Sequence, residues 1–169
     1  MKIAILNGSP RKENTYALCE AFAEGAKEAG HEVEILHVGK MKIGGCLGCE
    51  YCHTKGNGAC VQKDDFEQVL EAYKTADMVV FASSVYYFDV TAQLSAAIQR
   101  VYCIGKPVAK QAALLLSSMS PNVYDGAIAT YKSILGFTGI EDKGVYTAFG
   151  DENKSEAKLA EVKAFAAAL

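Results

Sequence analysis

The sequence KIAILNGSPRKENT at residues 2–15 decides the fold, because it joins an apolar run to a polar loop and to the start of a helix. Apart from one lysine, residues 2–6 are apolar, which is typical of a buried strand. Residues 15–29 then carry apolar side chains at helical spacing, namely Leu18, Phe22 and Ala26. Gly30 ends that pattern. The order is therefore strand, loop and helix.

The same alternation continues along the chain. Further strands are predicted at residues 31–38, 78–82, 112–116 and 144–149, and further helices at residues 65–75, 91–103, 124–136 and 155–169. Five strands that alternate with five helices indicate a parallel sheet with helices on both faces. Ligands bind such sheets outside the carboxyl ends of the strands. We therefore expect the site in the loops at residues 7–15, 83–91 and 117–124.

Composition limits the class of protein. A chain of 169 residues, half of them apolar, fits one domain over residues 1–169. The net charge of −3, without a run of like charge, gives no footprint for nucleic acid or an anionic membrane. Residues 1–6 are too short for a signal peptide, so we expect a cytoplasmic protein with reduced thiols and with small molecules or proteins as partners.

The first loop, residues 7–15, has the groups that bind a phosphate monoester. It supplies hydroxyls, a side-chain amide and a guanidinium at a helix start, where free N–H groups favour an anion. It lacks the Gly-Lys-Ser/Thr of a triphosphate loop and the three spaced glycines of a dinucleotide fingerprint. A monophosphate cofactor is therefore favoured. The alternative is an ordinary strand-to-helix turn with an asparagine or threonine cap.

Two loops carry a family resemblance. Gly8-Ser9-Pro10-Arg11 with Asn14-Thr15, and the segment at residues 83–88 (SSVYYF), resemble the flavodoxin-like NAD(P)H-dependent FMN reductases. The first loop is one residue shorter than is common in that family, and Ser84 replaces a proline. The resemblance implies an α/β, flavodoxin-like three-layer sandwich with a five-stranded parallel sheet in the order 2-1-3-4-5.

The resemblance also implies roles for residues. The FMN phosphate would be held by Ser9, Arg11, Asn14 and Thr15, and the flavin would be enclosed by Ser84, Val85, Tyr86, Tyr87, Phe88 and Ser118. The alternative for the aromatic residues is core packing at a strand end. The flavin itself accepts hydride, so we assign no catalytic side chain.

Residues 39–64 form a long, glycine-rich insertion with four of the six cysteines. The pattern Cys46-x2-Cys49-x2-Cys52-x7-Cys60 suits a metal centre, and three close thiols with a distant fourth favour a four-iron, four-sulfur cluster. Zinc usually takes two separated pairs. The pattern resembles the iron-sulfur flavoproteins, which relay electrons between FMN and a cluster across a subunit interface. Zinc, redox-active thiols and idle thiols stay open.

Three functions follow. The first is an FMN-dependent oxidoreductase that passes electrons from NAD(P)H to a flavin, quinone or similar small acceptor. The alternative is an iron-sulfur flavoprotein that relays electrons between ferredoxin, a four-iron, four-sulfur cluster and FMN. A third is a zinc-stabilised binding module without flavin chemistry. The family resemblance implies a homodimer or homotetramer.

Overall fold

The computed structural model describes residues 1–105 and 108–169 and contains one parallel sheet at its centre. The strand order is β2-β1-β3-β4-β5, so the predicted flavodoxin-like order is confirmed. The strands are β1 (Lys2–Asn7), β2 (Glu32–Leu36), β3 (Met78–Ser84), β4 (Gln111–Ser118) and β5 (Glu141–Phe149).

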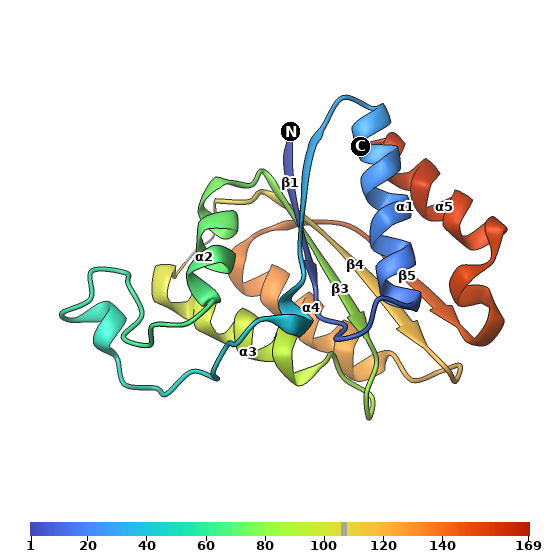
Figure 1. Cartoon of the computed structure of the whole chain (residues 1–169). Helices are drawn as coiled ribbons and strands as arrows, with labels where there is room; N and C mark the ends of the chain where they lie inside the picture. The colour runs from blue at the N-terminus through green and yellow to red at the C-terminus, as the bar shows by residue number, and fades with distance from the viewer. Residues whose placement is uncertain (106–107) are drawn as a thin grey trace.

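Helices cover both faces of this sheet (Figure 1). One face carries α1 and α5, and the other carries α2, α3 and α4 (Figure 1). The helices are α1 (Asn14–Glu28), α2 (Phe66–Thr75), α3 (Ala92–Arg100), α4 (Asp125–Thr138) and α5 (Glu156–Ala167), with short 3-10 turns η1 (Val38–Lys40), η2 (Tyr51–His53), η3 (Val101–Ile104) and η4 (Gly150–Lys154).

The two cores follow from the alternation of side chains along each strand. Ile3 and Ile5 pack toward α1 and α5, while Ala4 and Leu6 pack toward the opposite helices. Every residue of β3 is buried, which is why its first five residues, 78–82, read as a continuous apolar run; the strand ends in the buried polar residues Ser83 and Ser84. Burial on both faces therefore fixes the central strands and brings their carboxyl ends to one edge of the sheet.

Several predicted boundaries differ from those of the structure. The fourth helix passes the predicted end at Gly136 and stops at Thr138, because Gly139 takes a left-handed φ of 74° that terminates it. The fifth strand starts at Glu141 rather than Gly144, because the edge strand is partly exposed there and carries charged residues. The predicted helix at residues 91–103 also divides into α3 and the 3-10 turn η3.

The insertion at residues 39–64 extends away from the sheet before the chain enters α2 (Figure 1). Its regular structure is limited to the short turns η1 and η2. The turn η2 contacts η3, so the insertion lies beside the carboxyl end of α3. Over the described ranges, no helix has the length and apolar character needed to span a membrane.

Candidate functional site

A hollow lies where β1, β3 and β4 end, and all three predicted loops contribute to it. It contains about 350 Å³ of empty space. The predicted residues that line it are Ser9, Arg11, Asn14, Thr15, Ser84, Val85, Tyr86 and Ser118. The prediction missed Glu13, Ser117 and Met119, which also line it. Each of the three is next to a predicted residue, so loop position was the only sequence signal for them.

Hydrogen bonds fix the first loop in place. The N–H of Ser9 donates to Asn7 Oδ1 at 3.0 Å, and the hydroxyl of Thr91 donates to the carbonyl of Gly8 at 2.8 Å. The N–H of Gly8 donates to the carbonyl of Ala82 at 2.8 Å. The loop is therefore tied to both β3 and the start of α3, which makes it a preorganised cradle.

The N-terminus of α1 is open to the hollow. No side chain caps this helix, and its first turn has no acidic residue. The free N–H groups of the first turn and the helix dipole therefore favour an anion at this end. Glu13 is the nearby acid, and Lys154 pairs with it; the hydrogen bond and charge of Lys154 lower the pKa of Glu13. Within the described residues, Arg11 has no ion-pair partner.

Buried polar groups surround the rest of the hollow. The hydroxyl oxygens of Thr15 and Ser117 lie 2.6 Å apart. Ser118 lies at the wall, but its hydroxyl is already bonded to Ser120 O and Tyr124 Oη, each at 2.7 Å.

Two buried polar atoms near the loops lack partners. Ser84 Oγ and Asn7 Nδ2 find no hydrogen-bond partner among residues 1–105 and 108–169. Buried polar groups are usually satisfied, so free atoms beside an uncapped helix fit a ligand with several oxygens. The hollow therefore offers hydrogen-bond donors to a ligand that carries an anionic group and further polar oxygens.

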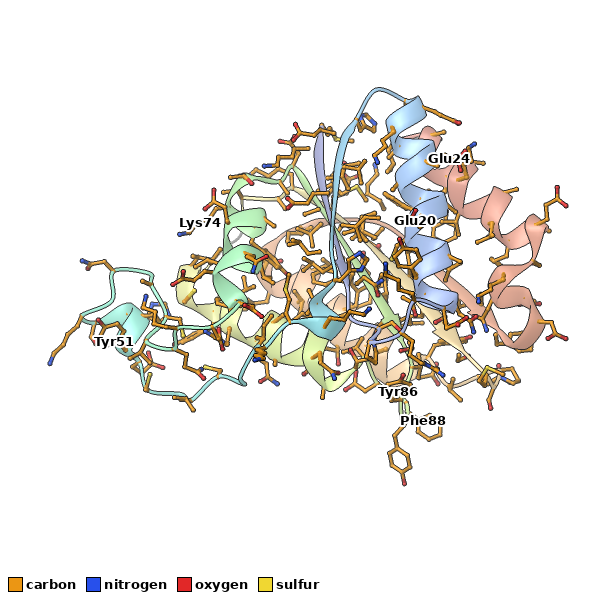
Figure 2. The ribbon with its side chains drawn as sticks, viewed as in Figure 1. Glu20, Glu24, Tyr51, Lys74, Tyr86 and Phe88 are labelled. Carbon is orange, nitrogen blue, oxygen red and sulfur yellow. The ribbon has the colours of Figure 1, made fainter. Side chains whose placement is uncertain are left out.

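An aromatic turn forms the rim of the hollow. Tyr86 N donates to Asp89 O at 3.0 Å, and the two central residues have left-handed φ angles, 52° for Tyr87 and 71° for Phe88. Tyr87 is 98% exposed, so core packing does not explain this residue. Figure 2 shows Tyr86 and Phe88 in the loop that follows β3. The backbone of this loop reaches the first turn of α4, where a Cβ on Gly126 would lie 2.5 Å from the carbonyl oxygen of Phe88. Tyr87 and Phe88 do not line the hollow itself.

Such a turn is strained. Two positive φ angles define a type I′ turn, which normally takes asparagine and glycine. A bulky side chain in that region costs about 1–3 kcal/mol, and strain of this kind clusters at ligand sites. The exposed aromatic faces are thus held in place at a cost in stability, as expected for residues that contact a ligand ring.

The four clustered cysteines line a second cavity. Cys46, Cys49, Cys52 and Cys60 each contribute to its lining. The prediction missed Arg100, Tyr102 and Cys103, which reach the cavity from α3 and η3. The two cavities have no lining residue in common. Tyr51, on the cysteine insertion, lies well away from Phe88 (Figure 2).

The thiols of this cavity are free and differ in environment. Cys46 and Cys49 are exposed, whereas Cys52 and Cys60 are half-buried and Cys103 is buried. Burial raises the pKa of Cys52, and burial together with the charges of Cys52 and Cys60 raises the pKa of Cys103. Within the described residues, no three potential ligands converge closely enough to hold a metal ion. The donor set fits a thiolate-bound centre by its chemistry, because four thiols border one cavity.

Comparison with curated proteins places the chain near two iron-sulfur flavoproteins of Archaeoglobus fulgidus. One is 45% identical over 91 residues, which cover 54% of this chain and 44% of the relative. The other is 35% identical over 136 residues, which cover 79% of this chain and 56% of the relative. The chain thus spans about half the length of these curated relatives.

Solved structures agree on the fold. The chain is similar to an FMN-dependent NADH-azoreductase from Bacillus anthracis in complex with FMN, with a TM-score of 0.76, 17% identity and 99% coverage of both chains. At that identity the likeness concerns the fold alone. A family model described as NADPH-dependent FMN reductase matches residues 1–142, which include the first loop at residues 7–15, the cysteine insertion and the aromatic turn. The chain therefore belongs to the NADPH-dependent FMN reductase family.

Proposed function

We propose that this protein is an FMN-dependent oxidoreductase that takes electrons from NAD(P)H and passes them to a flavin, quinone or similar small acceptor. The observation that carries the proposal is the polar hollow at the uncapped N-terminus of α1. Membership of the family and the fold shared with FMN-containing reductases support it. When FMN is bound, its ring supplies the hydride chemistry.

The residues of the hollow bind and orient the cofactor. Ser9, Arg11 and the first N–H groups of α1 hold the phosphate, because they combine hydroxyl, cation and helix dipole at one place. Asn14 and Thr15 add polar side chains, and Ser84 offers an unpartnered hydroxyl. Val85 and Tyr86 line the same hollow and would form a wall beside the flavin ring. The strained Tyr87 and Phe88 present aromatic faces to a second ring, that of the nicotinamide or the acceptor.

Two measurements test this function. Fluorescence titration measures FMN affinity, and anaerobic addition of NADPH or NADH measures bleaching of the flavin. Arg11→Gln should weaken FMN binding at least tenfold, whereas the matched control Lys12→Gln should not, because Lys12 lies over the ring of Tyr16 and outside the hollow. A wild-type protein that takes up no FMN, or whose flavin is not bleached by either nucleotide, would contradict the proposal.

A second function is favoured by one observation, the gathering of Cys46, Cys49, Cys52 and Cys60 around one cavity. The names of the Archaeoglobus relatives support it. In that function the protein relays electrons between ferredoxin, a four-iron, four-sulfur cluster and FMN. Iron and acid-labile sulfide in anaerobically purified protein test it, and stoichiometric zinc without iron would instead favour a zinc-stabilised module.

Assembly and location belong to the same proposal. The two cavities share no lining residue within one chain. The resemblance to iron-sulfur flavoproteins implies relay across a subunit interface, so we expect a homodimer or homotetramer. Six free cysteines support a reducing compartment, the cytoplasm. Light scattering at several protein concentrations tests the assembly, and a monomer with both redox groups loaded would contradict it.

A further inference from the structure

Arg100 is a fully buried cation at the edge of the cysteine cavity. It is 2% exposed, and its Nη1 donates to both carboxylate oxygens of Asp64, at 2.6 and 2.7 Å. Its guanidinium lies 4.4 Å above the ring centroid of Phe66. Charged side chains are almost never fully buried unless they are paired, so Arg100 occupies a site built to receive it.

Arg100 joins the two ends of the cysteine segment. Its Nη1 donates to Gly44 O and its Nη2 donates to Gln62 O, each at 3.3 Å. Asp64 completes the link, because its carboxylate accepts the N–H of Gly44 at 3.0 Å. Gly44 precedes the first clustered cysteine and Gln62 follows the last. One buried side chain therefore closes the segment that carries all four thiols.

One donor of Arg100 stays free. Its Nε–H is buried and has no hydrogen-bond partner within the described parts of the chain, and Arg100 lines the cysteine cavity. Burial opposes the charge, but Asp64 and the neighbouring Cys60 raise the pKa of Arg100, so the guanidinium remains a donor. Buried donors are rarely left unpaired in native proteins. The natural acceptor in a cavity bordered by thiols is sulfur.

We propose that Arg100 is a positioning residue for a thiolate-bound metal centre, in which it closes the cysteine segment and donates its Nε–H to a sulfur of that centre. The inference rests on the second proposed function, metal binding by the four cysteines. Because Asp64 balances the charge of Arg100, its effect on the centre comes mainly from the directed hydrogen bond. Hydrogen bonds to the sulfurs are among the features that set the potential of such centres.

Cobalt(II) alone is the probe, added without air to the full chain after removal of bound metal. Thiolate-to-cobalt charge-transfer absorption reports both affinity and the environment of the sulfurs. Arg100→Gln should weaken Co²⁺ binding at least tenfold. Arg100→Lys keeps a cation, so it should bind Co²⁺ more tightly than Arg100→Gln. It lacks the planar arrangement of N–H donors, so its charge-transfer band should still be shifted from that of wild type.

Lys132→Gln is the matched control, because it breaks an ion pair with Asp142 outside the cysteine cavity. Urea unfolding shows whether each variant folds. If Arg100→Gln does not fold, the comparison of wild type with Arg100→Lys tests the proposal. A second readout uses iron: in protein reconstituted with iron and sulfide, Arg100→Lys should lower the midpoint potential by about 59 mV, which is tenfold in a one-electron equilibrium.

The outcomes separate the two proposals. Wild-type protein that binds no Co²⁺ would contradict metal binding by the cysteines and this inference with it. Wild-type and Arg100→Lys proteins with the same Co²⁺ affinity, band position and potential would overturn the role of Arg100 alone. Loss of affinity in the Lys132→Gln control as well would also overturn it, because the effect would then be one of general stability.

Discussion

The hydroxyl oxygens of Thr15 and Ser117 lie 2.6 Å apart, although 102 positions separate the two residues in the sequence. Both side chains are buried. The contact joins the first turn of α1 to the end of β4, so the first loop, residues 7–15, and the loop after β4 keep a fixed relative position. This one hydrogen bond therefore couples the stability of the fold to the shape of the hollow.

Thr15→Val should reduce the free energy of unfolding by about 1–3 kcal/mol, because it leaves the hydroxyl of Ser117 buried without a partner. The double variant Thr15→Val/Ser117→Ala should lose less than the sum of the single variants, because both partners are then gone. Urea unfolding of the four proteins measures the coupling. Strictly additive effects would show that the bond is not formed in solution.

The strained turn offers a second test. Tyr87→Asn/Phe88→Gly places the favoured residues of a type I′ turn where two aromatic residues have positive φ, so unfolding should cost about 1–3 kcal/mol more. The same variant should slow flavin reduction by NADPH, because the exposed rings are lost. Phe137→Ala is the control, since Phe137 is 79% exposed in α4 but lies outside the turn. A variant that is no more stable would mean that the turn is not strained.

Burial explains which parts of the fold were predictable. Every residue of β3 is buried, and its first five residues, 78–82, form a continuous apolar run, so its position followed from the sequence. The sheet order was implied by the family resemblance, and the structure confirms it. The start of β5 did not follow, because Glu141 and Asp142 lie on a partly exposed edge strand where charge is tolerated. Only hydrogen bonding to β4 makes those residues part of the sheet.

The candidate sites divide in the same way. The hollow was predictable because the carboxyl ends of parallel strands meet at one edge. Arg100 and Cys103 were missed because they reach the cysteine cavity from α3 and η3, far along the chain, and no local pattern marks them. The strain in the turn was missed because its two central positions hold Tyr87 and Phe88 rather than the asparagine or glycine that signals positive φ.

Acid should destabilise the protein partly through Asp64. Burial disfavours its charge, but hydrogen bonds from Arg100 and from the N–H groups of Gly44 and Phe66 outweigh that effect and lower its pKa. A lowered pKa stabilises the fold above the unfolded value of about 3.9, and this contribution is lost as pH falls through the folded value. The free energy of unfolding, measured with urea between pH 6 and pH 3, should therefore decline less in Asp64→Asn than in wild type. Equal declines in the two proteins would mean that the fold does not lower the pKa of Asp64.

The thiols should react in a fixed order. The thiolate attacks the methylene carbon of iodoacetamide and displaces iodide, so exposed Cys46 and Cys49 should be alkylated before Cys52, whose pKa is raised by burial. Buried Cys103 and Cys19, both with raised pKa, should react only when the protein unfolds. Mass spectrometry of metal-free protein at pH 8 over time measures each site. Early alkylation of Cys103 would mean that its thiol is accessible in the folded protein.

The backbone at Gly39 packs closely against the backbone of the first loop. A Cβ at this buried position would lie 2.4 Å from the backbone of Ser9, so Gly39→Ala must displace either the first loop, residues 7–15, or η1. Overpacking of this kind costs about 1–3 kcal/mol, and a displaced Ser9 should weaken FMN binding at least tenfold. Gly136→Ala is the control: its Cβ would meet nothing within 4 Å, and alanine within α4 should stabilise the fold by about 0.5–1 kcal/mol. If Gly39→Ala is destabilised but binds FMN as tightly as wild type, then the added methyl group displaces η1 rather than the first loop. Phosphate binding by Ser9 would then not depend on the close packing at Gly39.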